Sequence, residues 1–119
     1  KHITRIAEKT AESMGGTCEI DIMVGYPCLI NEPLLTARTH AHMIEYMSEE
    51  NVVELPVRLT AEDFSYYSQQ ADACFYRLGT GNIDKGITSA VHTPTFDIDE
   101  KALEIGMGLM AYLAVRELD

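Results

Sequence analysis

The sequence has few basic residues and no long apolar run, and both shortages exclude classes of protein. Nine Lys and Arg stand against nineteen Asp and Glu among 119 residues, which gives a formal net charge of −10. Binding to a phosphate backbone needs clustered Lys and Arg, so we expect no nucleic-acid partner. No stretch of about 18 apolar residues occurs, so we expect no membrane-spanning segment and no membrane partner.

Cysteine is scarce and follows no pattern. Cys18, Cys28 and Cys74 are odd in number and widely spaced, without a C-x-x-C pair. Neither a disulfide framework nor a zinc knuckle is indicated. The first residues do not lead into the apolar core of a signal peptide. We therefore expect a reduced, cytoplasmic location.

What the chain does have is a 46 % hydrophobic content and a clear alternation of periodic segments, as expected of a globular domain. Helical spacing or start signals predict helices over 3–14, 33–50, 60–70 and 98–117. For the second of these, Asn31 is the expected cap, Pro33 lies in the first turn, and one stripe can hold Leu35, Thr39, His42, Met43 and Tyr46. Alternating or compact apolar runs predict strands over 17–26, 52–57 and 73–78. From residue 31 onward this order predicts an α/β layer structure, while the first thirty residues look like a separate unit. The glycine-bearing loop 79–86 contains neither G-x-G-x-x-G nor G-K-[ST], so no nucleotide fingerprint is present.

The candidate functional stretch is 91–100, in which a histidine is followed by a stiff turn and an acidic helix start. Pro94 fixes its own φ and restricts the residue before it, so His92 should be presented on an ordered turn. Asp97 and Glu100 have capping-box spacing for the final helix. One histidine alone is weak evidence of a metal site, because ligands come in sets.

Two further histidines are predicted to be surface residues. His40 and His42 lie two positions apart on an expected helix, so they point in different directions and cannot chelate together.

Several segments together resemble the C-terminal part of the M20 family of metallopeptidases and amidohydrolases, in the branch that cleaves N-acyl amino acids and hippurate-like compounds. The matching segments, in chain order, are Gly25–Pro27 with Asn31, Ala61–Tyr67, Phe75–Gly81, His92–Pro94 and Phe96–Leu103. The resemblance implies a catalytic α/β domain with a mostly parallel sheet and an inserted lid domain that mediates dimerisation. Residues 1–27 would be the last helix and strand of the lid, and 28–119 the C-terminal part of the catalytic domain. The chain would then be a fragment of a larger, dimeric protein.

The resemblance also implies two divalent metal ions, zinc or manganese, and a role for two residues. His92 matches the family's last metal ligand. Glu62 resembles an acidic position near the rim of the active site, although a helix-start acid that binds backbone N–H groups is the alternative. The family's other ligands and its catalytic glutamate have no counterpart in this sequence, so the fragment by itself is expected to hold no metal and to be inactive.

The implied reaction is hydrolysis of the amide bond of an N-acyl amino acid or small peptide, in which metal ions activate water. Two alternatives stay open. One is a non-catalytic acidic α/β interaction domain, which binds a partner through its apolar final helix or associates through an edge strand at 17–24. The other is a degenerate family member that kept the fold and lost the metals.

Overall fold

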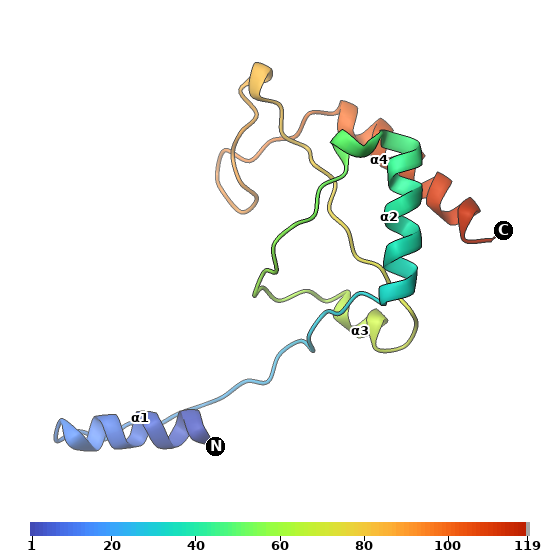
Figure 1. Ribbon diagram of the computed structural model, residues 1–119. Helices are drawn as coiled ribbons and strands as arrows, with labels where there is room; N and C mark the ends of the chain where they lie inside the picture. Colours follow the sequence, from blue (N-terminus) through green and yellow to red (C-terminus); the bar gives the residue numbers. More distant parts are fainter. Residues whose placement is uncertain (119) are drawn as a thin grey trace.

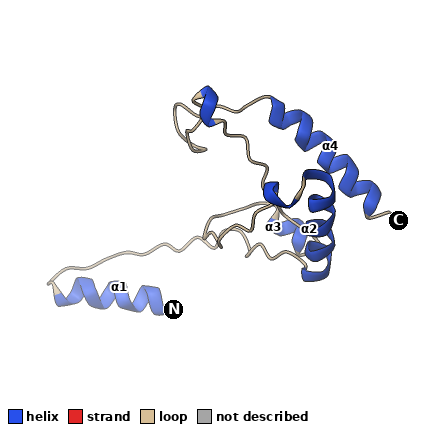
Figure 2. Ribbon diagram, turned by 45° about the horizontal axis from the view of Figure 1, so that its top comes forward, coloured by secondary structure: helices blue, strands red, loops and turns tan. Residues whose placement is uncertain are grey.

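The computed structural model describes residues 1–118, which form an elongated arrangement of helices joined by extended segments (Figure 1). The radius of gyration is 20.6 Å and the extents are 61 × 38 × 20 Å, whereas a compact domain of this length would have a radius of about 13–14 Å. Helix α1 (His2–Ser13) lies apart from the other helices in both views, and an extended stretch connects it to them (Figures 1 and 2).

Helix α1 confirms the prediction over 3–14. It ends in a Schellman motif, because Gly15 has a φ of 75° and the Gly16 N–H donates to the Ala11 carbonyl at 2.9 Å. None of its residues is buried. Ile3 and Ile6 on its apolar face are 68 % and 61 % exposed, so this amphipathic helix has no cover within the described chain.

Helix α2 (Pro33–Met47) begins as predicted with a proline at its first position, but the capping residue is Glu32. Its carboxylate accepts hydrogen bonds from the N–H groups of Leu35 at 2.5 Å and Leu34 at 3.1 Å. These bonds hold the pKa of Glu32 below its ordinary value, the bond from Leu35 most strongly. The helix ends earlier than predicted, and a short 3-10 helix, η1 (Glu49–Asn51), follows it.

Asn31 was predicted to be the cap, and that assignment is wrong. Its side-chain amide instead takes up both backbone groups of Phe75, donating to the carbonyl at 2.9 Å and accepting from the N–H at 2.8 Å. A side chain therefore makes the two hydrogen bonds that a neighbouring strand would make.

Helix α4 (Lys101–Arg116) packs against α2 and forms the core of the molecule. The buried cluster consists of Met43, Leu109 and Leu113, with Met47, Val52 and Tyr76 packed against it. Sequence spacing predicted a start near residue 98, but the helix starts three residues later, where the Lys101 N–H donates to the Asp99 carboxylate at 3.3 Å. The capping box expected from Asp97 and Glu100 does not form, since no side chain at position 100 caps the helix.

The predicted parallel sheet is not confirmed. Segments 17–26, 52–57 and 73–78 are extended, yet residues 1–118 contain no strand, and the sole ladder contact there is an isolated antiparallel bridge between Asn82 and Ile87. An extended segment cannot satisfy its own N–H and C=O groups, so it becomes a strand only beside a neighbour. Segments 55–58 and 75–77 instead line one shared opening of about 310 Å³.

The helix predicted over 60–70 is reduced to α3 (Ser65–Ser68). Residues before it form a tight turn in which the Glu62 carbonyl accepts from the Ser65 hydroxyl at 2.5 Å and from the Ser65 N–H at 3.2 Å. These local side-chain bonds compete with a longer helix. Ser65 is fully buried at this turn.

Candidate functional site

His92 lies in an ordered turn over residues 91–95 and is exposed. The turn is closed by a hydrogen bond of 2.8 Å between the hydroxyls of Ser89 and Thr95. The Thr93 hydroxyl donates to the Ala90 carbonyl at 2.7 Å. These bonds flank the exposed histidine on both sides, so local contacts close the turn that carries it.

The backbone of His92 is strained, because its φ is 65°. This left-handed conformation costs a residue with a Cβ about 1–2 kcal/mol. Backbone outliers of this kind persist when the surroundings impose them, and they concentrate at functional sites. Pro94 predicts a stiff turn, but no signal in the sequence indicates this positive φ at His92.

A second set of contacts, centred on Asn82 and Asp99, ties down both ends of the loop that carries His92. The Asn82 backbone exchanges two hydrogen bonds of 2.9 Å with Ile87, where the loop leaves. The Asn82 side-chain amide donates to the Asp99 carboxylate at 2.5 Å, where the loop returns. The Asp99 N–H also donates to the Thr80 carbonyl at 2.8 Å. The glycine-bearing loop 79–86 is thereby bound to the segment that starts α4.

Asp99 is the most strongly perturbed acid of this site. Its carboxylate, 12 % exposed, accepts from the Lys85 ammonium at 2.7 Å as well as from Asn82. The bond from Lys85, followed by the bond from Asn82, lowers the pKa of Asp99 to about 2. The carboxylate therefore stays ionised through the ordinary pH range. Sequence reasoning missed this cluster, although Asn82, Asp84 and Gly86 are turn-forming residues that mark the loop.

Glu62, the second predicted site residue, acts within its own turn. Its carboxylate accepts from the Phe64 N–H at 3.2 Å, and its carbonyl holds Ser65. This is the helix-start arrangement that the sequence analysis kept as the alternative. Helix α3, which follows Glu62, lies well away from the loop over 86–96 in both views (Figures 1 and 2). The structure therefore does not bring Glu62 and His92 together.

The described residues do not by themselves make a metal centre. No group of three or more His, Cys, Asp or Glu side chains within residues 1–118 is placed to hold an ion. A single imidazole binds a divalent cation weakly, since metal sites need several ligands. His92 can contribute one nitrogen ligand, and any further ligands have to come from other polypeptide.

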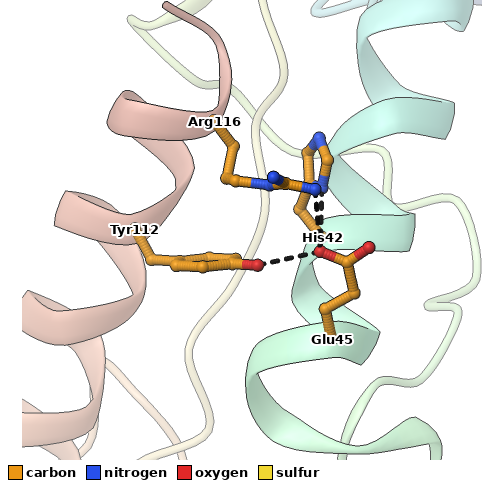
Figure 3. Close-up of polar contacts among 4 residues, drawn as sticks. All are labelled: His42, Glu45, Tyr112 and Arg116. Atoms are coloured by element: carbon orange, nitrogen blue, oxygen red, sulfur yellow. Dashed lines mark hydrogen bonds and ion pairs between the residues drawn. The ribbon is translucent and has the colours of Figure 1, made fainter. Parts of the chain in front are cut away.

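His42 is not the surface residue that the sequence predicted, while His40 is exposed as expected. The His42 side chain is 17 % exposed and joins a polar cluster between α2 and α4 (Figure 3). His42 Nδ1 lies 3.3 Å from Arg116 Nε and also 3.3 Å from Glu45 Oε2. Tyr112 and Arg116 lie four apart on α4, which puts both on the face toward α2.

Glu45 is the acceptor at the centre of this cluster. Its Oε2 accepts from the Tyr112 hydroxyl at 2.8 Å and from the Arg116 guanidinium at 3.2 Å. The hydrogen bond from Tyr112, followed by that from His42, lowers the pKa of Glu45, and the same carboxylate raises the pKa of Tyr112. These contacts join α2 to α4 and involve no residue of the His92 turn, so we assign them to helix packing.

Comparison with known proteins identifies the family. The sequence profile of Peptidase family M20/M25/M40 matches residues 2–116. The chain therefore belongs to this family of generally metal-dependent hydrolases.

The names of two relatives are those of hydrolases. An uncharacterized hydrolase of Staphylococcus aureus strain N315 is 40 % identical over 101 residues, which cover 83 % of this chain and 26 % of that protein. Thermostable carboxypeptidase 1 of Saccharolobus solfataricus is 35 % identical over 116 residues, covering 97 % of this chain and 29 % of that protein. The chain thus spans little more than a quarter of the length of these relatives. No solved structure matches it.

Within residues 1–118, every helix is too short or too polar to cross a membrane.

Proposed function

We propose that this chain is part of a metal-dependent hydrolase that cleaves the amide bond of N-acyl amino acids or small peptides, with His92 as a ligand of one of two divalent ions, zinc or manganese. The observation that carries the proposal is the exposed imidazole at a positive φ, held by a closed turn, in a chain of a hydrolase family. Imidazole nitrogen suits both metals. The carboxypeptidase among the relatives supports amide substrates.

The described residues supply one ligand, so the proposal places the remaining ligands and the catalytic acid in further polypeptide of the same protein. The relatives are long enough for this, because about three quarters of their length lies outside the matched region. In the chain alone we expect no retained metal pair and no hydrolysis. The role of the chain is to present His92. The contacts within its turn and at the ends of its loop hold the histidine in place.

We place Glu62 near the rim of the same active site in the assembled protein. Its carboxylate bonds a backbone N–H of its own turn, and the side chain is half-buried rather than enclosed. One free carboxylate oxygen is thus available to a neighbouring group. Exchange of Glu62 for Gln should slow hydrolysis without removing metal, whereas a purely structural role would change stability alone.

Residues 1–27 are proposed to belong to a lid that mediates dimerisation, and 28–119 to the catalytic domain. The separation of α1 from α2 and α4 supports this division (Figure 1). All three cysteines are free thiols, which supports a reducing, cytoplasmic location.

The decisive experiment compares the longer protein with its His92→Ala variant and with His40→Ala as a matched control. Hydrolysis of N-acetyl and N-benzoyl amino acids and of dipeptides is measured with added manganese or zinc, and bound metal is counted by elemental analysis. We expect His92→Ala to lose activity and one metal ion, while His40→Ala keeps both. A His92→Ala protein that retains two ions and its activity would refute the assignment.

A second candidate function, a non-catalytic interaction domain, is favoured by the uncovered stripe of α4. Leu103, Met107 and Met110 are 51 %, 69 % and 59 % exposed and recur at helical spacing. This stripe lies on a different face from Leu109 and Leu113, which are buried against α2. Size-exclusion chromatography of the chain at rising concentration tests self-association, and a monomer throughout would contradict association through this stripe or through segment 17–24.

A further inference from the structure

One residue, Asn82, binds both ends of the loop that carries His92. Asn82 holds Ile87 through its backbone and Asp99 through its side chain, so residues 88–98 leave and return at one point. A loop whose two ends meet in this way is a compact Ω-type element. His92 lies near the middle of this loop.

We infer that Asn82 is a positioning residue for His92: by closing the neck of the 88–98 loop it keeps the His92 backbone in its left-handed conformation, with the side chain exposed. This inference rests on the proposed function, because the orientation matters only if the ring binds metal. His92 at a φ of 65° is strained, so an opened neck would let the residue relax to an extended conformation and turn its ring away.

Both the nitrogen and the oxygen of the Asn82 side-chain amide are hydrogen-bonded, which makes its role specific. Its nitrogen donates to Asp99, and its oxygen accepts from the Lys85 N–H at 3.2 Å. A flipped amide would lose both bonds. The bond to Asp99 is charge-assisted, and the Lys85 ammonium on the same carboxylate holds the acceptor in place. Alanine at position 82 would remove both bonds and leave the backbone bridge to Ile87 and the bonds of Asp99 to Thr80 and Lys85.

A reciprocal exchange offers a sharp test. Asn82→Asp alone places two carboxylates face to face and should open the neck. The double variant Asn82→Asp with Asp99→Asn restores an amide-to-carboxylate hydrogen bond in the opposite direction. It also keeps an acceptor for Lys85 at both positions. Asp84→Asn, in the same short helix η2 (Ile83–Lys85), removes one charge without a contact to Asp99 and serves as the control.

The readout is the backbone order of residues 89–96 in the full 119-residue chain, measured by ¹⁵N relaxation without metal. We expect order parameters near about 0.85 in the parent, the control and the double variant, and below about 0.6 in Asn82→Asp and Asn82→Ala. An Asn82→Asp loop as rigid as the parent, or a double variant as mobile as the single one, would overturn the inference.

Metal affinity of the longer protein separates this inference from the proposed function. Asn82→Asp should weaken binding of one ion about 10- to 100-fold, as residues that orient a ligand do, and the double variant should recover it. Unchanged affinity in Asn82→Asp beside a loss in His92→Ala refutes the positioning role and leaves the proposed function intact. Unchanged metal content in His92→Ala refutes the proposed function itself.

Discussion

Substitution of Leu109 by Ala tests whether the α2–α4 contact holds the structure together. Leu109 is 2 % exposed, the least exposed apolar side chain of the core, and it contacts the cluster of Met43 and Leu113. The exchange removes three carbons, whose transfer from water is worth about 2.4 kcal/mol. A cavity term adds to this in closed cores, but Leu109 also borders an open groove that can relax. We therefore expect a loss of about 2–3 kcal/mol in the free energy of unfolding.

Urea unfolding followed by near-ultraviolet circular dichroism of tyrosine measures this loss. The chain has no Trp, and the rings of Tyr46 and Tyr112 lie 5.3 Å apart across the two helices, so the signal reports their contact. Met110→Ala is the matched control, since Met110 is next to Leu109 on the same helix but is 59 % exposed. A Leu109→Ala chain within about 0.5 kcal/mol of the parent, or a control that loses as much, would refute the reasoning.

Three other predictions follow from the contacts around α4. Gly108→Ala should lower stability although Ala favours a helix by about 1 kcal/mol, because a Cβ there would collide with a tyrosine of α2; chemical denaturation gives the sign. Lys85→Met should raise the pKa of Asp99 from about 2 toward 3.8, as carboxyl NMR titration would show. Since that pKa is depressed on folding, the stabilisation from Asp99 is fully present above pH 3.8 and is lost as the pH falls through about 2. Tyr112→Phe should raise the pKa of Glu45, and an unchanged titration would contradict the bond between them.

Three of the four predicted helices agree with the structure, whereas the helix predicted over 60–70 is reduced to Ser65–Ser68. The bounds of α1 agree with the prediction within one residue, and those of α2 and α4 within about three. The buried side chains Thr39 and Met43 lie on the stripe expected for α2. The failures at helix ends have local causes. Glu32 caps α2 because its carboxylate reaches two N–H groups of the first turn. The Asn31 side chain instead donates to the carbonyl of Phe75.

The predicted sheet is not confirmed, because strand pairing depends on more than local sequence. Segments 52–57 and 73–78 have the composition of strands and are extended, but neither pairs with a strand among residues 1–118. Their conformation follows from local preference, whereas pairing depends on what lies beside them. Family membership supports a mixed architecture, yet the parallel order of strands stays a prediction.

The site shows the same division between local and distant contacts. The turn around His92 is closed by Ser89, Thr93 and Thr95, all within a few residues, so Pro94 and its neighbours were enough to predict an ordered turn. The neck depends on Asn82 and on a partner 17 residues away, and no periodicity or motif signals that bond. If the local bonds alone held the histidine, residues 89–96 would stay ordered when the neck opens. The order of residues 89–96 in the Asn82 variants therefore decides whether local sequence suffices to present the imidazole.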